Sequence, residues 1–105
     1  MQFIETPIFT ALVERRLSDD EYRSLQLTLV LRPDQGKLIP GSGGLRKLRW
    51  RMPGAGKRGG LRLIYYWIPT AEMILMLYLY SKREQGDLTT AQTRELGRVA
   101  REELE

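Results

Sequence analysis

The chain has 105 residues, which leaves room for one small domain, because typical domains contain about 100 to 150 residues. Hydrophobic residues make up 42% and charged residues 29%, as in globular proteins rather than disordered ones. Cys and His are both absent, which excludes disulfides, thiolate catalysis, and histidine as general base or metal ligand. We expect neither a metal nor a cofactor, so any catalysis must use Lys, Arg, Tyr, Asp or Glu.

The start of the chain, Met1–Glu5, has neither the basic region nor the apolar core of a signal peptide, and no apolar run reaches 18 residues. We therefore expect a soluble cytoplasmic protein that does not contact a membrane.

The positive charge is concentrated in one part of the sequence. The net charge is +4, yet no Asp or Glu occurs between Gln35 and Ala71, and this window holds eight Lys or Arg residues. A basic patch on an otherwise mildly acidic protein is typical of a protein that binds the phosphates of nucleic acid. The alternative is a solvated basic surface without a specific role.

The N-terminal part predicts a strand and two helices. Residues 2–5 read as a short strand, and a helix follows from Pro7 to about Arg16, with Thr6 as its cap. The sequence Ser18–Glu21 is a capping box that begins a second helix, which ends at Arg32–Pro33. The apolar positions expected to face inward are Ile8, Phe9, Leu12 and Val13 in the first helix, and Tyr22, Leu25, Leu27, Leu29, Val30 and Leu31 in the second.

The middle of the chain predicts three strands. A loop over 34–44 leads to strands at 45–51, 61–68 and 73–80, which short turns at 53–60 and 69–72 connect. Three strands joined by short turns predict an antiparallel meander. The glycines at 54, 56 and 59 match the spacing of a dinucleotide-binding loop, but they lead into a strand instead of a helix, so we interpret them as a hairpin turn.

A second capping box, Thr89–Gln92, begins a C-terminal helix whose apolar positions are Leu96, Val99, Ala100 and Leu104. The order of elements predicts an α+β fold: a compact single domain over residues 1–105, with a mainly antiparallel twisted sheet, two N-terminal helices and a C-terminal helix. We expect the helices to cover one face of the sheet, which leaves the other face free for a ligand.

Alternation along the strands places candidate ligand-binding side chains on common faces. Lys47, Arg49 and Arg51 share one face of their strand, Arg62 shares a face with Ile64 and Tyr66, and Tyr78, Tyr80 and Lys82 form a third row. If these rows converge, they form a cleft with cations, phenols and no carboxylate, which suits single-stranded nucleic acid. The alternative for the tyrosines is an ordinary core position with a solvated hydroxyl.

Five segments carry a resemblance to a known family. They are Phe3–Phe9, Leu17–Arg23, Ile39–Arg49, Gly56–Tyr66, and Tyr80–Glu84 together with Asp87–Thr89. With these segments the chain resembles the RelE superfamily of bacterial toxins over nearly its whole length, and most closely the HigB-type branch. The resemblance implies the toxin of a type II toxin-antitoxin system, an endoribonuclease that enters the A site of the 30S subunit and cuts the mRNA there. It also implies a cognate antitoxin, which in this branch usually carries a helix-turn-helix DNA-binding domain.

The resemblance also assigns roles to individual residues. It implies Lys47, Arg49, Arg62 and Lys82 or Arg83 as catalytic, and we take Lys82 as the last of these. The basic patch and the aromatic rows add candidate RNA-binding residues, which are Arg46, Lys57, Arg58, Tyr66, Tyr80 and Arg83. The expected reaction is attack of a ribose 2′-OH on its own 3′-phosphate, with Lys47 or Lys82 taking the proton and arginines stabilising the phosphorane. RelE has a tyrosine that acts on the substrate where this chain has Thr89.

Two other functions fit the same residues. A non-catalytic RNA-binding or ribosome-binding module would use the same basic patch without cutting transcripts. A partner-binding scaffold would have lost toxicity altogether.

Overall fold

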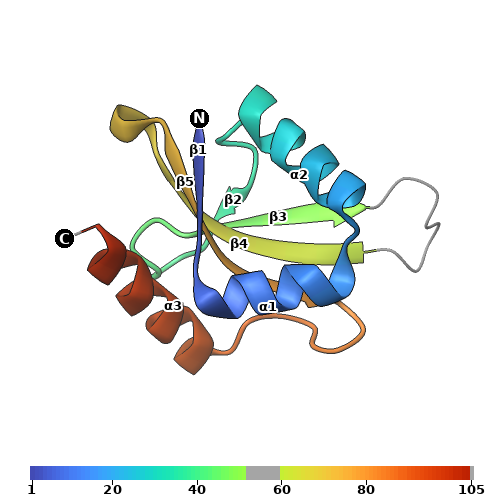
Figure 1. Ribbon diagram of the computed structural model, residues 1–105. Helices are drawn as coiled ribbons and strands as arrows, with labels where there is room; N and C mark the ends of the chain where they lie inside the picture. Colours follow the sequence, from blue (N-terminus) through green and yellow to red (C-terminus); the bar gives the residue numbers. More distant parts are fainter. Residues whose placement is uncertain (52–59, 105) are drawn as a thin grey trace.

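The computed structural model describes residues 1–51 and 60–104 and has the predicted α+β architecture (Figure 1). Its elements are β1 (Gln2–Glu5), α1 (Pro7–Arg16), α2 (Asp19–Leu31), β2 (Lys37–Leu38), β3 (Arg46–Arg51), β4 (Gly60–Ile68), the 3-10 turn η2 (Pro69–Ala71), β5 (Met73–Ser81) and α3 (Thr90–Glu103). The predicted turn over 53–60 lies outside the described residues, except for Gly60. None of the described helices is long and apolar enough to cross a bilayer.

The five strands form one sheet in the order β1-β5-β4-β3-β2. The strands β3, β4 and β5 are antiparallel neighbours, which confirms the predicted meander. The strand β1 lies parallel to β5 at one edge, and β2 pairs with β3 at the other edge. The sequence did not predict β2, because its two residues lie in a segment rich in Gly and Pro whose local signal is that of a loop.

The helix starts agree with the capping signals. The Thr6 side chain accepts a hydrogen bond from the N–H of Phe9 at the start of α1. Reciprocal capping boxes are present at the other two helices, between Ser18 and Glu21 for α2 and between Thr89 and Gln92 for α3. These signals are local, so they hold whatever the helix later packs against.

The prediction that all helices cover one sheet face is wrong. Each face has its own hydrophobic cluster: α1 and α2 contribute Phe9, Val13, Leu25 and Leu29 to one, and α3 contributes Leu96, Val99 and Ala100 to the other. Figure 1 shows α3 apart from the other two helices. The face opposite α1 and α2 is therefore only partly free, and a ligand must bind where α3 does not cover it.

The inward faces of α1 and α2 are narrower than predicted. Ile8 is 61% exposed, and Leu27, Val30 and Leu31 on α2 are exposed as well. The reason is geometric, because a helix that lies on a sheet buries one stripe, here Phe9 and Val13 on α1 and Leu25 and Leu29 on α2.

An irregularity in the β4–β5 pairing orients the end of β5. Tyr65 pairs with Met76 whereas Ile64 pairs with Tyr78, so Leu77 is an extra residue on β5. A bulge of this kind lets two consecutive side chains share a face. Leu77 and Tyr78 both belong to the cluster on the α3 side, and Tyr80 follows them there.

Candidate functional site

One row of polar side chains crosses the three central strands. Arg49 on β3 is the register partner of Arg62 on β4, and Arg62 is in turn the partner of Tyr80 on β5. Like charges placed directly opposite each other on a sheet are destabilising, and no packing reason requires two arginines here. An anionic ligand between Arg49 and Arg62 would relieve their repulsion.

Arg62 is the most unusual member of this row. Arg62 is only 9% exposed. Its guanidinium donates one long hydrogen bond, 3.5 Å, to the carbonyl of Leu61. No carboxylate in the described residues forms an ion pair with it, and residues 52–59 contain no Asp or Glu. A charge that is removed from water without a partner raises the free energy of the fold, so an anionic ligand at this position would offset that cost.

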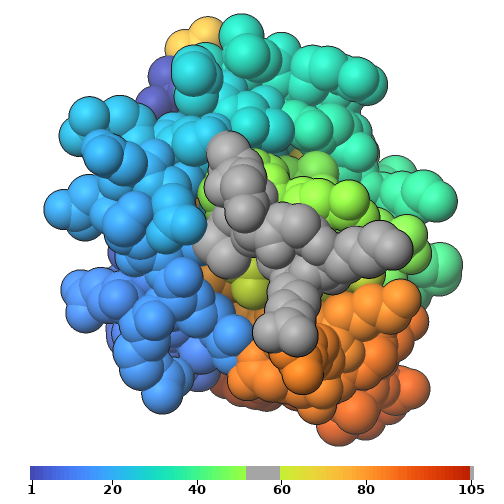
Figure 2. All heavy atoms as spheres, turned by 90° about the vertical axis from the view of Figure 1, so that its right-hand side faces the viewer, coloured from blue at the N-terminus to red at the C-terminus, as the bar shows by residue number. Residues whose placement is uncertain are grey.

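A hollow of about 560 Å³ opens beside Arg62. Lining residues come from β3, from the start of β4 and from the segment after β5: Arg49, Trp50, Arg51, Gly60, Arg62, Lys82 and Arg83. Five of these seven residues are cations and none is an acid. Figure 2 views this end of the molecule, with α1 and α2 in blue on one side and the segment after β5 in orange below. The structure therefore brings together Arg49, Arg62, Lys82 and Arg83 of the predicted set.

Tyr80 belongs to this row but does not line the hollow at Arg62. The residue is 2% exposed, so a base cannot stack on its face, and its hydroxyl is the one buried side-chain polar atom in the described residues that lacks a hydrogen-bond partner. Burial raises the pKa of Tyr80, and the negative charge of Asp87 raises it further. The phenol is therefore protonated at neutral pH.

The hollow at Arg62 has no acidic lining residue, but one carboxylate pairs with Lys47 of the predicted set. Asp87 accepts a bond from the Lys47 ammonium at 3.3 Å, so an acid from outside the basic window reaches the candidate site. The N–H of Leu88 and then the Lys47 ammonium hold the pKa of Asp87 below its usual range. The sequence analysis missed Asp87 because the two partners lie 40 residues apart, and only its position after the last strand could have suggested it.

The segment from Lys82 to Asp87 is anchored to the N-terminal half of the molecule. The Arg16 guanidinium pairs with the Glu84 carboxylate at 2.5 Å. The Glu84 carboxylate also accepts a hydrogen bond from the N–H of Ser81. The Tyr78 hydroxyl also contacts the Gln85 side chain at 3.3 Å. These contacts fix the direction in which Lys82 and Arg83 leave β5.

Other predicted residues lie elsewhere. The Arg46 guanidinium donates to the carbonyls of Asp34 and Gly36, which ties the end of α2 to β3. Tyr66 belongs to the cluster under α3, outside the hollow at Arg62. Thr89, at the position where the resemblance implies a tyrosine, caps α3. The predicted RNA-binding residues Lys57 and Arg58 lie outside the described residues.

Comparisons with known proteins address the fold. No family model matches the sequence. A solved structure similar to this chain is that of a double arginine-to-alanine variant of the E. coli toxin RelE in the free state, with a TM-score of 0.53, 16% sequence identity, and coverage of 81% of this chain and 86% of that chain. The chain has the RelE fold. At this level of identity the likeness shows the fold alone, so any role for the arginine row depends on its own geometry.

Proposed function

We propose that this protein is a toxin of a type II toxin-antitoxin system, of the HigB-type branch, and that it cleaves mRNA in the A site of the 30S subunit. The observation that carries the proposal is the environment of Arg62. Its nearly buried side chain lies opposite Arg49, and no carboxylate of the described residues forms an ion pair with it. The RelE-like fold and the acid-free basic window support it.

The charge of the hollow suits a phosphoryl transition state. When a 2′-OH attacks the adjacent phosphorus, the O2′–P bond forms, the P–O5′ bond breaks, and the phosphorane carries an additional negative charge. Arg49 and Arg62 would donate to its non-bridging oxygens, and Lys82 and Arg83 would bind the flanking phosphates. Preorganised donors in a site of low dielectric constant lower such a barrier by a few kcal/mol each. The products are a 2′,3′-cyclic phosphate and a 5′-OH end.

Two proton transfers complete the reaction. An ammonium accepts the 2′-OH proton only after it has lost its own, whereas the Asp87 carboxylate is already an acceptor and lies 3.3 Å from Lys47. Asp87 therefore joins Lys47 and Lys82 as a candidate base, although its lowered pKa makes it a weak one. The O5′ leaving group needs a proton, and the Lys82 ammonium, which lines the hollow, is the candidate donor.

A weak base explains why such an enzyme would need the ribosome. Alignment of the attacking oxygen with the leaving group can supply several kcal/mol of the barrier, and a ribosome that holds the codon in place would provide it. The protein would thus act slowly on free RNA. We propose a helix-turn-helix antitoxin as the partner that keeps it inactive.

The test is primer extension on transcripts after brief induction of the protein in bacterial cells. We expect new 5′ ends within translated codons for the wild-type chain, and their loss for Arg62→Gln and for Arg49→Gln. The matched control is Arg98→Gln, which removes the same charge from the outer face of α3, where Arg98 pairs with Glu95 and Glu102.

Intact transcripts with the wild-type protein, accompanied by stalled growth and co-sedimentation with 30S subunits, would instead establish the non-catalytic ribosome-binding module. Cleavage that persists in both arginine variants would remove the arginine row from the mechanism.

A further inference from the structure

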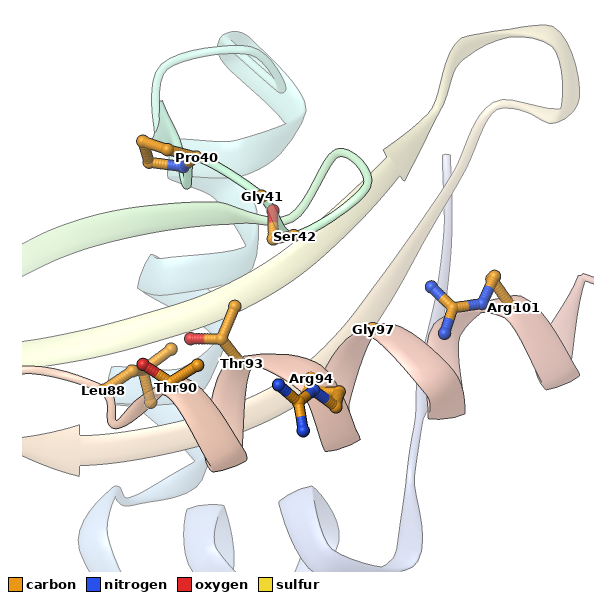
Figure 3. A pocket seen from close by; sticks show the side chains of 9 residues that line it. All are labelled: Pro40, Gly41, Ser42, Leu88, Thr90, Thr93, Arg94, Gly97 and Arg101. Carbon is orange, nitrogen blue, oxygen red and sulfur yellow. The ribbon is translucent and has the colours of Figure 1, made fainter.

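A second basic hollow lies between α3 and the loop that precedes β3. Its volume is about 400 Å³, and Pro40, Ser42, Thr93, Arg94, Gly97 and Arg101 are among its lining residues. Figure 3 shows Thr93 and Arg101 extending from α3 toward the turn that carries Ser42, with Arg94 between them along the helix. Neither the arginine row nor the fold requires cations at this place.

The charges on α3 are divided between two sides of the helix. Arg98 forms ion pairs with Glu95 and Glu102, so its charge is compensated. Arg94 and Arg101 both line the hollow, and no carboxylate of the described residues pairs with either of them. Seven residues of helix separate these two cations by about 10 Å along the axis, so each can bind a different phosphate of one strand.

The wall opposite α3 is held in a fixed position. The Ser42 hydroxyl donates to the carbonyl of Ile39 at 2.6 Å and accepts from the N–H of Leu45 at 3.0 Å. Gly97 allows the helix to approach this loop closely, because a Cβ at that position would lie 3.1 Å from the Ser42 carbonyl oxygen. The hollow is thus present before any ligand binds.

A smaller hollow adjoins this place and reaches Lys47 of the predicted catalytic set. It is lined by Lys37, Lys47 and Asp87, and it shares Pro40, Leu88 and Thr93 with the hollow at Arg94. Lys47 lies two residues before Arg49 on β3, so the two side chains share a sheet face. Cations therefore continue from Arg62 and Arg49, past Lys47 and Lys37, to Arg94 and Arg101.

We propose that Arg94 and Arg101 form a second RNA phosphate-binding site, which holds the strand or the ribosomal RNA beside the cleavage site. This inference rests on the proposed function, because it takes the hollow at Arg62 as the place of the scissile phosphate. The ligand chemistry is the RNA phosphate backbone, and its source is either the mRNA or the ribosomal RNA.

The experiment measures binding by fluorescence anisotropy with 2′-O-methyl RNA, which cannot be cleaved, in lengths of about 4 and about 12 nucleotides. A second arm measures binding to 30S subunits without mRNA. The test variant is Arg94→Gln/Arg101→Gln, and the control is again Arg98→Gln. All three positions are exposed, so the variants keep the fold, which thermal unfolding verifies.

If the mRNA is the ligand, the double variant binds the longer RNA about tenfold more weakly than wild type, while the shorter RNA is little affected. The negative slope of log K against log salt concentration also becomes shallower by about 1.4, because each of the two lost phosphate contacts on a single strand contributes about 0.7. If ribosomal RNA is the ligand, the loss occurs in the 30S arm instead. The Arg98→Gln protein matches wild type in both arms.

The inference is overturned if the double variant equals Arg98→Gln in both arms while Arg49→Gln/Arg62→Gln still loses binding, and in that case the proposed function stands. A wild-type protein that binds neither the longer RNA nor the 30S subunit overturns both proposals.

Discussion

The effect of Arg62 on the free energy of unfolding tests whether this residue serves the function or the fold. Replacement of a nearly buried charge that has no acidic partner by an apolar side chain of similar length removes a desolvation cost. We expect Arg62→Met to leave the free energy of unfolding unchanged or raise it by about 1 kcal/mol, while transcript cleavage is lost. Urea denaturation measures the first effect and primer extension the second.

The control for this variant is Leu63→Ala, the next residue on β4, which is fully buried on the opposite face and should cost about 2 to 5 kcal/mol. A loss of stability of that size in Arg62→Met would mean that Arg62 holds the fold together.

Tyr65 shows the opposite case, a buried phenol with a structural role. Its hydroxyl accepts from the N–H of Gly36 at 2.9 Å and donates to the carbonyl of Pro33 at 2.7 Å, which fastens the loop after α2 to β4. We expect Tyr65→Phe to lower the free energy of unfolding by about 1 to 3 kcal/mol, because the Gly36 N–H loses its partner in a buried place. Chemical denaturation checks this, and unchanged stability would show that water replaces the phenol.

At the residue scale, the sequence predicted which side chains share a face of a strand but not which residues contact one another across the site. Alternation along the strands correctly grouped Lys47 with Arg49, because the two-residue period is a local property of a strand. It could not reveal the Asp87 contact, which depends on where the chain goes after β5. It also could not separate Tyr65 from Tyr80, since only the packed structure shows which phenol has partners.

At the element scale, an ion pair is one of the contacts that anchor the segment after β5. The hydrogen bond from Arg16 holds the pKa of Glu84 below its usual value of 4.5. A lowered pKa in the folded state means that the ion pair stabilises the fold above pH 4.5, and that this contribution disappears as the pH falls through the folded pKa. The position of Lys82 and Arg83 thus depends on an ionised Glu84.

We expect Glu84→Gln to melt at a lower temperature than wild type at about pH 7, and this difference to be smaller at about pH 3. Thermal unfolding at the two pH values measures this difference. Glu14→Gln, on the exposed side of α1 and without an ion pair in the described residues, serves as the control. A melting difference that is equally large at both pH values would show that the charge of Glu84 does not anchor this segment.

Elements with strong local signals were predicted well, but the side of the sheet on which each helix packs was not. The capping boxes of α2 and α3 and the strand pattern of β4 are properties of neighbouring residues. An amphipathic helix, however, reveals that it buries a face and not which side of the sheet it covers. For this reason α3 was placed with the other helices, although it packs on the opposite face.

At the scale of the whole molecule, the proposed function gives Asp87 a part in both RNA binding and proton transfer. It is the acid that reaches the basic surface formed by residues between Gln35 and Ala71, where it pairs with Lys47. Removal of its charge makes the local potential more positive, which strengthens attraction of RNA phosphates. The same change removes a proton acceptor and frees the Lys47 ammonium to move.

We therefore expect Asp87→Asn to bind single-stranded RNA several-fold more tightly than wild type at low salt, with a steeper salt dependence, and to cleave transcripts at least about tenfold more slowly. Asparagine keeps the oxygen that accepts from the N–H of Leu88, so the turn before α3 is preserved. Asp19→Asn, at the start of α2, changes the net charge equally and should leave both properties as they are. Anisotropy titrations and primer extension separate the two effects, and parallel loss of binding and cleavage in Asp87→Asn would show that the carboxylate orients Lys47 for the RNA instead of limiting its attraction.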